Sequence, residues 1–264
     1  MSIEMPLENA SLIQLQQTPI DNVLNIIDQG LVHLPSYREL YYRWERQQWR
    51  AQEIDFSPDR RQWEGMTQDQ RTMRMYGLSA FFQGEACVTD TLAPYITAMP
   101  DEEARIFVTT QLVDEARHTV FFARFFNEVL GVDKDTMEEM LGMARQYMNS
   151  HIKYILIDAL SEVAERIRQE PGNLAYLVEG ITLYHIVVEG MMALAGQRGI
   201  LEYYRLNGLF PGFRGGFTAV ARDESRHVVF GVKFLRDMIQ RDATNAQVVQ
   251  AAIDKYAATA LTAI

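Results

Sequence analysis

The chain has 264 residues, of which 48% are hydrophobic and 23% are charged, as expected for a globular protein whose core needs no disulfide staples. Its net charge of −10 at pH 7 argues against a nucleic-acid partner, because phosphates attract basic surfaces. The single cysteine, Cys87, excludes an internal disulfide, and the N-terminal residues lack the basic start and apolar run of a signal peptide. We therefore expect a cytoplasmic protein.

The first segment, residues 1–58, is predicted to be a partly irregular arm with one or two helices. It carries three of the eight prolines up to Pro35 and a cluster of aromatic residues between Tyr37 and Trp49. From Thr67, a plausible helix cap, the pattern becomes helical and runs towards Pro100, with a kink expected at Pro94.

The remaining predicted helices follow one another with short breaks at proline and glycine. We expect them over residues 101–131, 134–169, 173–198 and 215–241, and from about residue 243 onwards. No convincing alternating strand is present, so the fold class is all-α with four long central helices forming a bundle. The prediction is one domain, 1–264, comprising the arm (1–58), the bundle (67–242) and a last helix (243–264).

The most apolar stretch, residues 176–196, has about the length of a membrane span. It carries Glu179, His185 and Glu189, and charges inside a spanning helix are costly. A buried helix of the bundle explains the stretch better than an integral membrane segment.

The motif Asp-Glu-x-Arg-His occurs twice, beginning at Asp114 and at Asp223, each time followed by apolar residues. Residues three apart share one helix face, so Glu115 and His118 can reach one point, as can the Glu224 and His227 pair. A carboxylate and an imidazole at this spacing can together bind one transition-metal ion.

A di-metal centre requires one further inward carboxylate from each of the other two bundle helices. Glu85 and Glu189 meet this requirement, since each stands in an apolar helix beside a glycine. Four carboxylates and two neutral imidazoles carry a charge of −4, which two divalent ions balance. Oxygen and nitrogen ligands without thiolate favour iron or manganese over structural zinc.

Other ionisable residues are assigned lesser roles. His185 shares a face with Glu189 but would break the symmetry as a ligand, so we expect it to be a hydrogen-bonded core histidine. Asp114 is interpreted as a solvated surface acid, whereas for Asp223 a hydrogen bond to a ligating histidine competes with that interpretation. Glu179 is placed at the solvated end of the bundle. His33 and His151 are interpreted as structural.

Five stretches carry a resemblance to a known family: EIDFSPDRRQWEGM, GEACVTDTLAPYITAM, LVDEARHTVFF, YHIVVEGMMALAG and RDESRHVVFG. Between Trp49 and Arg236 the chain resembles ribonucleotide reductase small subunits. It resembles more closely their sister group, the small-subunit-like ligand-binding oxidases. The resemblance implies a ferritin-like fold and a di-metal carboxylate centre.

The resemblance also implies an activity. The oxidases hold manganese and iron, with di-iron as an alternative, bind a long-chain fatty acid and activate dioxygen, with an electron donor that stays unknown here. They form an ether cross-link between the positions of Val88 and Tyr184. In an ideal helix Tyr184 points away from Glu189, so the cross-link requires a distortion such as a π-bulge near Gly190. A homodimer is implied as well.

The resemblance assigns each candidate ligand to a metal. Glu85, Glu115 and His118 would hold the manganese-preferring site, with Glu115 bridging to the iron site. Glu189, Glu224 and His227 would hold iron. Trp49 and Asp223 match an electron path that ends, in the reductases, at the first ligand histidine, here His118. Cys87 departs from the acidic or polar residue expected at its position.

Two other functions compete with the oxidase. A reductase small subunit would generate a radical for a large-subunit partner, but Phe122 stands where such subunits usually carry a tyrosine. The final KYAATALTAI has a helical pattern, whereas a flexible docking tail is expected of such a subunit. Ferritin-like iron storage is the third candidate, and its sites usually lack the second histidine.

Overall fold

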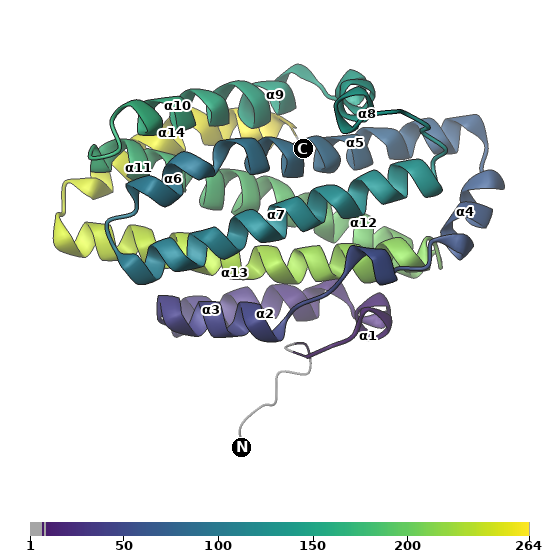
Figure 1. Cartoon of the computed structure of the whole chain (residues 1–264), viewed down its shortest axis with the longest axis horizontal. Coiled ribbons are helices and arrows are strands. Elements are labelled where there is room, and N and C mark those ends of the chain that lie inside the picture. Colours follow the sequence, from purple (N-terminus) through teal and green to yellow (C-terminus); the bar gives the residue numbers. More distant parts are fainter. Residues whose placement is uncertain (1–6, 8, 264) are drawn as a thin grey trace.

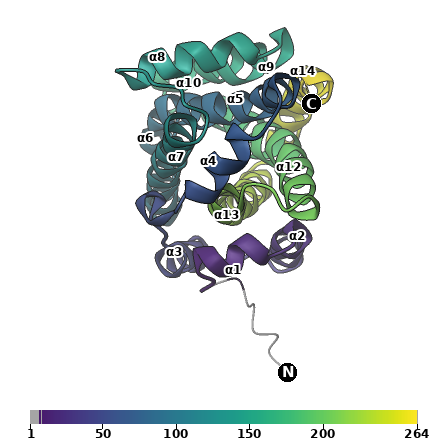
Figure 2. The same ribbon diagram turned by 90° about the vertical axis from the view of Figure 1, so that its right-hand side faces the viewer.

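A computed structural model describes residue 7 and residues 9–263, and all regular structure within this part of the chain is helical. Figures 1 and 2 show four long helical stretches running side by side as a bundle. They are α5 (Gln68–Thr91), α7 (Glu102–Glu128), the continuous α11–η4–α12 (Leu174–Ile181, Thr182–Ala193, Leu194–Leu206) and α13 (Pro211–Arg241). The predicted all-α fold class with a ferritin-like four-helix core is confirmed.

The N-terminal arm contains more helix than the sequence analysis expected. It forms α1 (Leu12–Gln17), α2 (Ile20–Val32), α3 (Tyr37–Arg46), the short η1 (Ala51–Glu53) and α4 (Ser57–Glu64). Ser11 and Ser36 each start a helix with a reciprocal capping box, which satisfies backbone donors that short helices otherwise leave open. Helices α1 and α2 pack on α13, and α3 packs on α7, so the arm covers one side of the bundle (Figure 2).

The prediction of a single helix over residues 134–169 is wrong. The segment is broken into α8 (Met137–Ala144), η2 (Arg145–Tyr147), α9 (Ser150–Lys153), η3 (Tyr154–Ala159) and α10 (Leu160–Gln169). The break has a local cause, because Met148 is extended and the Asn149 side chain accepts a hydrogen bond from the Ile152 amide, which starts a new helix. This segment covers the side of the bundle opposite the arm (Figure 2).

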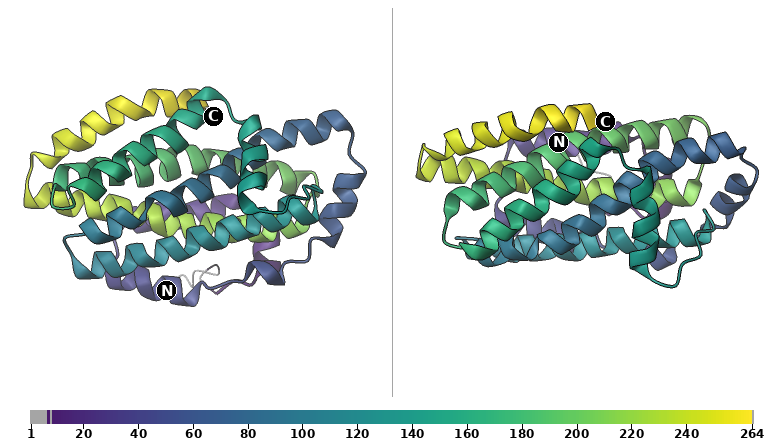
Figure 3. Two further views of the ribbon diagram at one scale, coloured as in Figure 1. Left: turned by 45° about the horizontal axis from the view of Figure 1, so that its top comes forward. Right: turned by 90° about the horizontal axis from the view of Figure 1, so that it is seen from above.

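Other helix ends also differ from the prediction, since α12 runs to Leu206 rather than to residue 198 and α13 begins at Pro211 rather than at residue 215. At Pro94 the chain does not kink but breaks, since α5 ends at Thr91 and α6 (Ala93–Ala98) begins there. The last helix, α14 (Asn245–Ala263), packs along η4 and returns beside the bundle (Figure 3).

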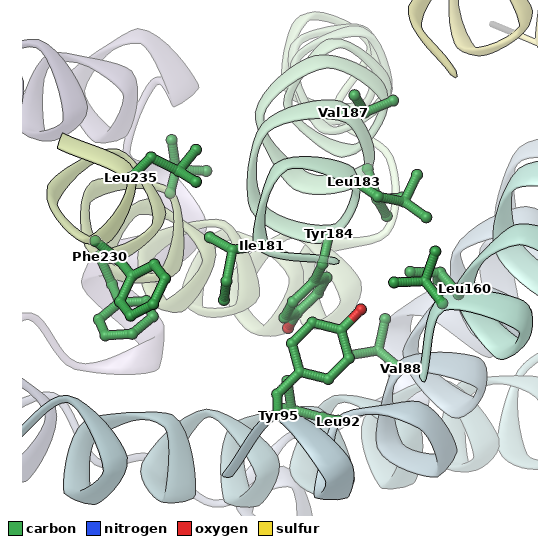
Figure 4. Packing of buried hydrophobic residues seen from close by; sticks show 14 of the residues in the cluster. Val88, Leu92, Tyr95, Leu160, Ile181, Leu183, Tyr184, Val187, Phe230 and Leu235 are labelled. Atoms are coloured by element: carbon green, nitrogen blue, oxygen red, sulfur yellow. The ribbon is translucent and has the colours of Figure 1, made fainter. Parts of the chain in front are cut away.

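Two apolar clusters fill the interior, and the candidate ligands lie between them along the helices. On α5, Phe82 belongs to one cluster and Val88 to the other, with Glu85 midway. On α7, the aromatic rings of Phe107 and Phe121 flank the second candidate pair in the same way. Figure 4 shows part of the cluster that contains Val88 and Tyr184.

One helix in the described part of the chain, Leu174–Leu206, is long and apolar enough to cross a membrane by length and composition. In its most apolar window 67% of the residues are buried inside the bundle. This burial is what a core helix requires, as the sequence analysis expected.

We predict that Gly216→Ala destabilises the fold. An added Cβ would stand 2.3 Å from Cε2 of Phe121 and 2.7 Å from Cδ1 of Ile54, inside the packed core. The free energy of unfolding should fall by about 1–3 kcal/mol, which chemical denaturation measures. Gly142→Ala is the matched control, because that helical glycine has open space around it and should gain up to about 1 kcal/mol. Equal effects of the two substitutions would contradict the packing argument.

Candidate metal centre

The six predicted ligands come together in the middle of the bundle. Glu85 projects from α5, Glu115 and His118 from α7, Glu189 from η4, and Glu224 and His227 from α13, and none is more than 7% exposed. They form two overlapping groups, in each of which one ligand atom per residue lies within 4.8 Å of the others. The groups are Glu85, Glu115, His118, Glu224 and Glu115, Glu189, Glu224, His227.

Both groups contain Glu115, which the resemblance marks as the bridge, and both also contain Glu224. The resemblance assigns Glu224 to the iron site alone, but the geometry lets its carboxylate face both sites. Two shared carboxylates between two histidine-bearing sites are an arrangement suited to a pair of adjacent ions.

Each histidine turns one ring nitrogen towards three carboxylates. Nδ1 of His118 lies 3.1 Å from Glu85, 3.6 Å from Glu115 and 3.3 Å from Glu224. Nδ1 of His227 lies 3.0 Å from Glu189, 3.3 Å from Glu115 and 3.5 Å from Glu224. The two Nδ1 atoms are thus the nitrogen atoms that could bind metal ions, and the two Nε2 atoms are left for hydrogen bonds.

Burial makes this set of charges costly on its own. Burial raises the pKa of Glu85 well above its ordinary value against the opposing charge of His118, and burial together with the charge of Glu224 does the same for Glu189. For Glu115, hydrogen bonds from both histidines outweigh burial and lower the pKa. Such buried groups hold protons in place of the missing positive charge, and bound cations would displace these protons.

The donor set fits two metal ions. Oε2 of Glu189 and Oε2 of Glu224 are buried and have no hydrogen-bond partner among the described residues. A buried carboxylate oxygen without a partner is unusual, and coordination to a cation would satisfy it. The residues present could therefore hold a di-metal centre.

On the outer side of the histidines the structure confirms one hydrogen bond and corrects another interpretation. Oδ2 of Asp223 lies 3.3 Å from Nε2 of His118 and accepts a 2.8 Å hydrogen bond from Nε1 of Trp49, as the electron-path resemblance requires. Asp114 is not a solvated surface acid. It is fully buried, and its Oδ2 lies 3.2 Å from Nε2 of His227. The repeated motif contained this information, because equivalent residues of the two copies face equivalent histidines.

Arginine residues of the same motif were missed by the sequence analysis. Nη2 of Arg226 lies 2.7 Å from Asp223 and 3.0 Å from Asp114, so one buried guanidinium joins the two carboxylates. Arg117 binds Asp114 from the other side. Burial would raise the pKa of Asp223, but Arg226 and the His118 hydrogen bond lower it well below the ordinary value. Asp223 is therefore ionised and holds the His118 ring in place.

The segment η4 is a π-helix from Thr182 to Ala193, which confirms the helix distortion predicted near Gly190. It turns Tyr184 towards the metal groups, where its hydroxyl donates a 2.7 Å hydrogen bond to Oε1 of Glu115. Burial and the charges of Glu115 and Glu189 raise the pKa of Tyr184 well above its ordinary value. Val88 is 5% exposed and lies in the same apolar cluster as Tyr184 (Figure 4).

A cavity of about 530 Å³ reaches the metal groups from the outside of the bundle. At its inner end it is lined by Val88, Tyr184 and carboxylates of both groups, and towards the surface by Tyr76 and Tyr147. The rest of its wall includes the polar residues Gln146 and Asn149 but is mostly apolar: Ala80, Phe81, Val188, Met192, Ala193, Ile200.

The remaining candidates stay outside the metal groups. His185 is a buried core histidine whose Nε2 lies 3.1 Å from Nε2 of Gln111, and burial lowers its pKa to about 3. Glu179 pairs with Arg166 at 2.9 Å, away from the centre. His33 and His151 are exposed, and Cys87 contacts Gln83 at 3.4 Å.

The chain is similar to known proteins in sequence and in fold. The family described as "Ribonucleotide reductase, small chain" matches residues 32–262. A variant of R2-like ligand-binding oxidase with an anaerobically reconstituted Mn/Fe cofactor is 24% identical, with 87% of this chain and 82% of that chain covered and a TM-score of 0.78. A variant with an aerobically reconstituted Mn/Fe cofactor is 25% identical, with 87% and 79% covered and a TM-score of 0.78. The family match includes all four bundle helices and every residue of the two metal groups, and the chain therefore belongs to the ribonucleotide reductase small-chain family.

Proposed function

We propose that this protein is a di-metal oxidase that uses dioxygen to remove two electrons from an unactivated C–H bond. The observation that carries the proposal is the apolar cavity that ends directly on both metal groups, beside Val88 and Tyr184. A centre that serves only as a radical store for a partner has no need of such a cavity. The bound metal pair supplies the binding and reduction of dioxygen.

Manganese and iron are the metals that we propose for the centre, with di-iron as the alternative. The similar structures carry a reconstituted Mn/Fe cofactor, and the carboxylate and imidazole ligands of this chain suit either metal. Glu85, Glu115 and His118 would hold manganese. Glu189, Glu224 and His227 would hold iron, with Glu115 shared.

Val88 and Tyr184 are the residues that we propose to be joined by the reaction. The Tyr184 hydroxyl already donates to Glu115, so its proton has an acceptor when the oxygen forms a new bond. The Cβ–H bond of Val88 and the O–H bond of Tyr184 break, and a Cβ–O bond forms. Two protons and two electrons leave, and dioxygen accepts the electrons.

We propose a long-chain fatty acid, or an apolar molecule of similar shape, as the ligand of the cavity. Its volume of about 530 Å³ lies within the range of small-molecule sites. The apolar wall suits an acyl chain, and the metal ions at the inner end suit a carboxylate head group.

The competing functions receive less support. In a radical-generating small subunit a redox-active tyrosine would be expected at the position of Phe122, but this phenylalanine is fully buried and packs among the rings of Phe81, Phe82 and Phe217. Iron storage gives no role to the Tyr184 hydrogen bond.

We also propose a cytoplasmic homodimer, for which α7 offers an exposed apolar stripe: Ile106, Val113, Val120.

The first test concerns the metals. Protein loaded with manganese and iron should bind about two ions per chain, and Glu189→Gln should lower this number, because the amide removes a charged ligand from one group. Metal analysis by mass spectrometry measures the content, and the melting temperature should rise with bound metal. Glu179→Gln is the control, since Glu179 lies outside both groups and should keep the full content. Equal metal loss in the two variants would contradict the ligand assignment.

A second test concerns the cross-link. After loading and exposure to air, peptides containing Val88 and Tyr184 should be joined, with a mass lower than their sum by two hydrogen atoms. Tyr184→Phe should abolish the joined species, because it removes the oxygen that forms the bond. Tyr95→Phe should leave it unchanged, since Tyr95 only packs against Tyr184 at a ring distance of 6.4 Å. Separate peptides in fully metallated wild-type protein would refute the cross-link.

A third test concerns the cavity. Ala193→Phe should fill part of it and reduce retention of added palmitate, measured by native mass spectrometry. Ala258→Phe, on the exposed side of α14, adds the same ring outside the cavity and should retain palmitate like the wild type. Undiminished binding to the Ala193 variant would place the ligand elsewhere.

A further inference from the structure

Three tryptophans occur in the chain, and two of them are linked to the metal groups through hydrogen bonds. Trp49 donates to Asp223, which faces His118. Trp44 donates a 2.9 Å hydrogen bond from Nε1 to Oδ1 of Asp114, and Oδ2 of Asp114 lies 3.2 Å from Nε2 of His227. Each metal group therefore has its own indole–carboxylate–imidazole chain.

The two indole–carboxylate–imidazole series differ in their access to solvent. Trp49 is 8% exposed and lies beneath Arg117, whose guanidinium is 5.3 Å from the centre of the indole ring. Trp44 lies on α3 and is partly exposed. Its ring is 5.8 Å from that of Tyr41, which in turn is 6.2 Å from Tyr42, a residue with 47% exposure. Aromatic rings thus lead from the surface to Asp114.

We infer that Trp44 and Asp114 form a second electron route, which serves the metal group of His227. One electron leaves the Trp44 ring and would lower the oxidation state of an oxidised metal ion in that group by one. The indole then carries a positive charge, which the hydrogen-bonded Asp114 carboxylate stabilises while the N–H proton stays shared between them. A one-electron donor at the surface, such as a reduced flavin or a metal complex, returns the electron to the ring and is oxidised.

The geometry gives this route a purpose. Two metal ions with separate histidines can be reduced independently if each histidine has its own donor, whereas a single route must pass electrons from one ion to the other. Arg226 contacts Asp114 and Asp223 with the same nitrogen, so both carboxylates are held in place for their respective rings. The inference rests on the proposed function only in requiring that the centre becomes oxidised.

The alternative is that Trp44 merely orients Asp114, which fixes the position of the His227 ring. A purely orienting role predicts changes in metal content but no involvement of the indole in electron transfer. The experiment must therefore follow electrons and radicals rather than activity.

The first measurement is the rate at which hexaammineruthenium(II), an outer-sphere one-electron donor, reduces the oxidised Mn/Fe centre in protein of measured metal content. Trp63 supplies the matched control, because it is buried beside Phe210 and contacts neither metal group. Trp63→Phe should reduce at the wild-type rate. Trp44→Phe should be slower, Trp44→Tyr should recover part of the rate, and the Trp44→Phe, Trp49→Phe double variant should be slower than either single variant. Equal rates for the Trp44→Phe and Trp63→Phe variants would overturn the inference.

A second measurement leaves Trp44 unchanged and so avoids any effect of its substitution on folding. In the Trp49→Phe, Trp63→Phe variant Trp44 is the only tryptophan. Rapid freezing during reaction of the reduced, metal-loaded protein with dioxygen should trap a radical whose electron paramagnetic resonance spectrum changes when the tryptophan is indole-deuterated. Oxidation of the centre without any such signal would overturn the route.

Failure of the proposed function is distinguishable from failure of the route. A loaded centre that air does not oxidise would count against the oxidase. The same protein can then be oxidised chemically with hexachloroiridate(IV), and its reduction rate still compares the Trp44→Phe and Trp63→Phe variants. Dependence on Trp44 would support the route, and its absence would refute it.

Discussion

The structure depends on one costly arrangement, the burial of four glutamates and two histidines within a single apolar bundle. No helix of the bundle could carry these residues alone, because a buried carboxylate without a counter-charge is strongly disfavoured. The four helices share the cost by placing all six groups at one level, where each imidazole faces three carboxylates. Two divalent ions complete the balance of charge, and the two apolar clusters flank the site on either side along the bundle.

The π-helical segment η4 is the second requirement. In an α-helix, residues five apart differ by about 140° in direction, so Tyr184 and Glu189 would point to different sides. In η4 the hydrogen bonds span one residue more per turn, and both side chains reach the metal groups. Gly231 on α13 permits the close approach, since a Cβ there would stand 2.3 Å from Cβ of His185. The position of Tyr184 beside the centre is therefore built into the backbone.

The sequence predicts the bundle and the six converging residues well, because both follow from helical periodicity. Glu115 and His118 lie one turn apart, and that relation survives any uncertainty in helix ends. The break at Asn149 was not predicted, since a polar cap within an apolar pattern competes with helix continuation only through local hydrogen bonds. The Trp44–Asp114 contact joins residues 70 positions apart and depends on how α3 packs against α7, which periodicity does not determine.

The two copies of the motif explain why the charge of the metal ligands and the charge of the residues outside the histidines balance separately. Asp114 and Asp223 add two negative charges beyond the histidines, and Arg117 and Arg226 add two positive charges in contact with them. This outer layer is neutral by itself, so the four glutamates alone match the charge of two divalent ions. Asp-Glu-x-Arg-His therefore supplies in five residues a metal ligand pair, a carboxylate for the opposite histidine and the cation that neutralises it. Because each aspartate faces the histidine of the other copy, neither motif is complete without its partner helix.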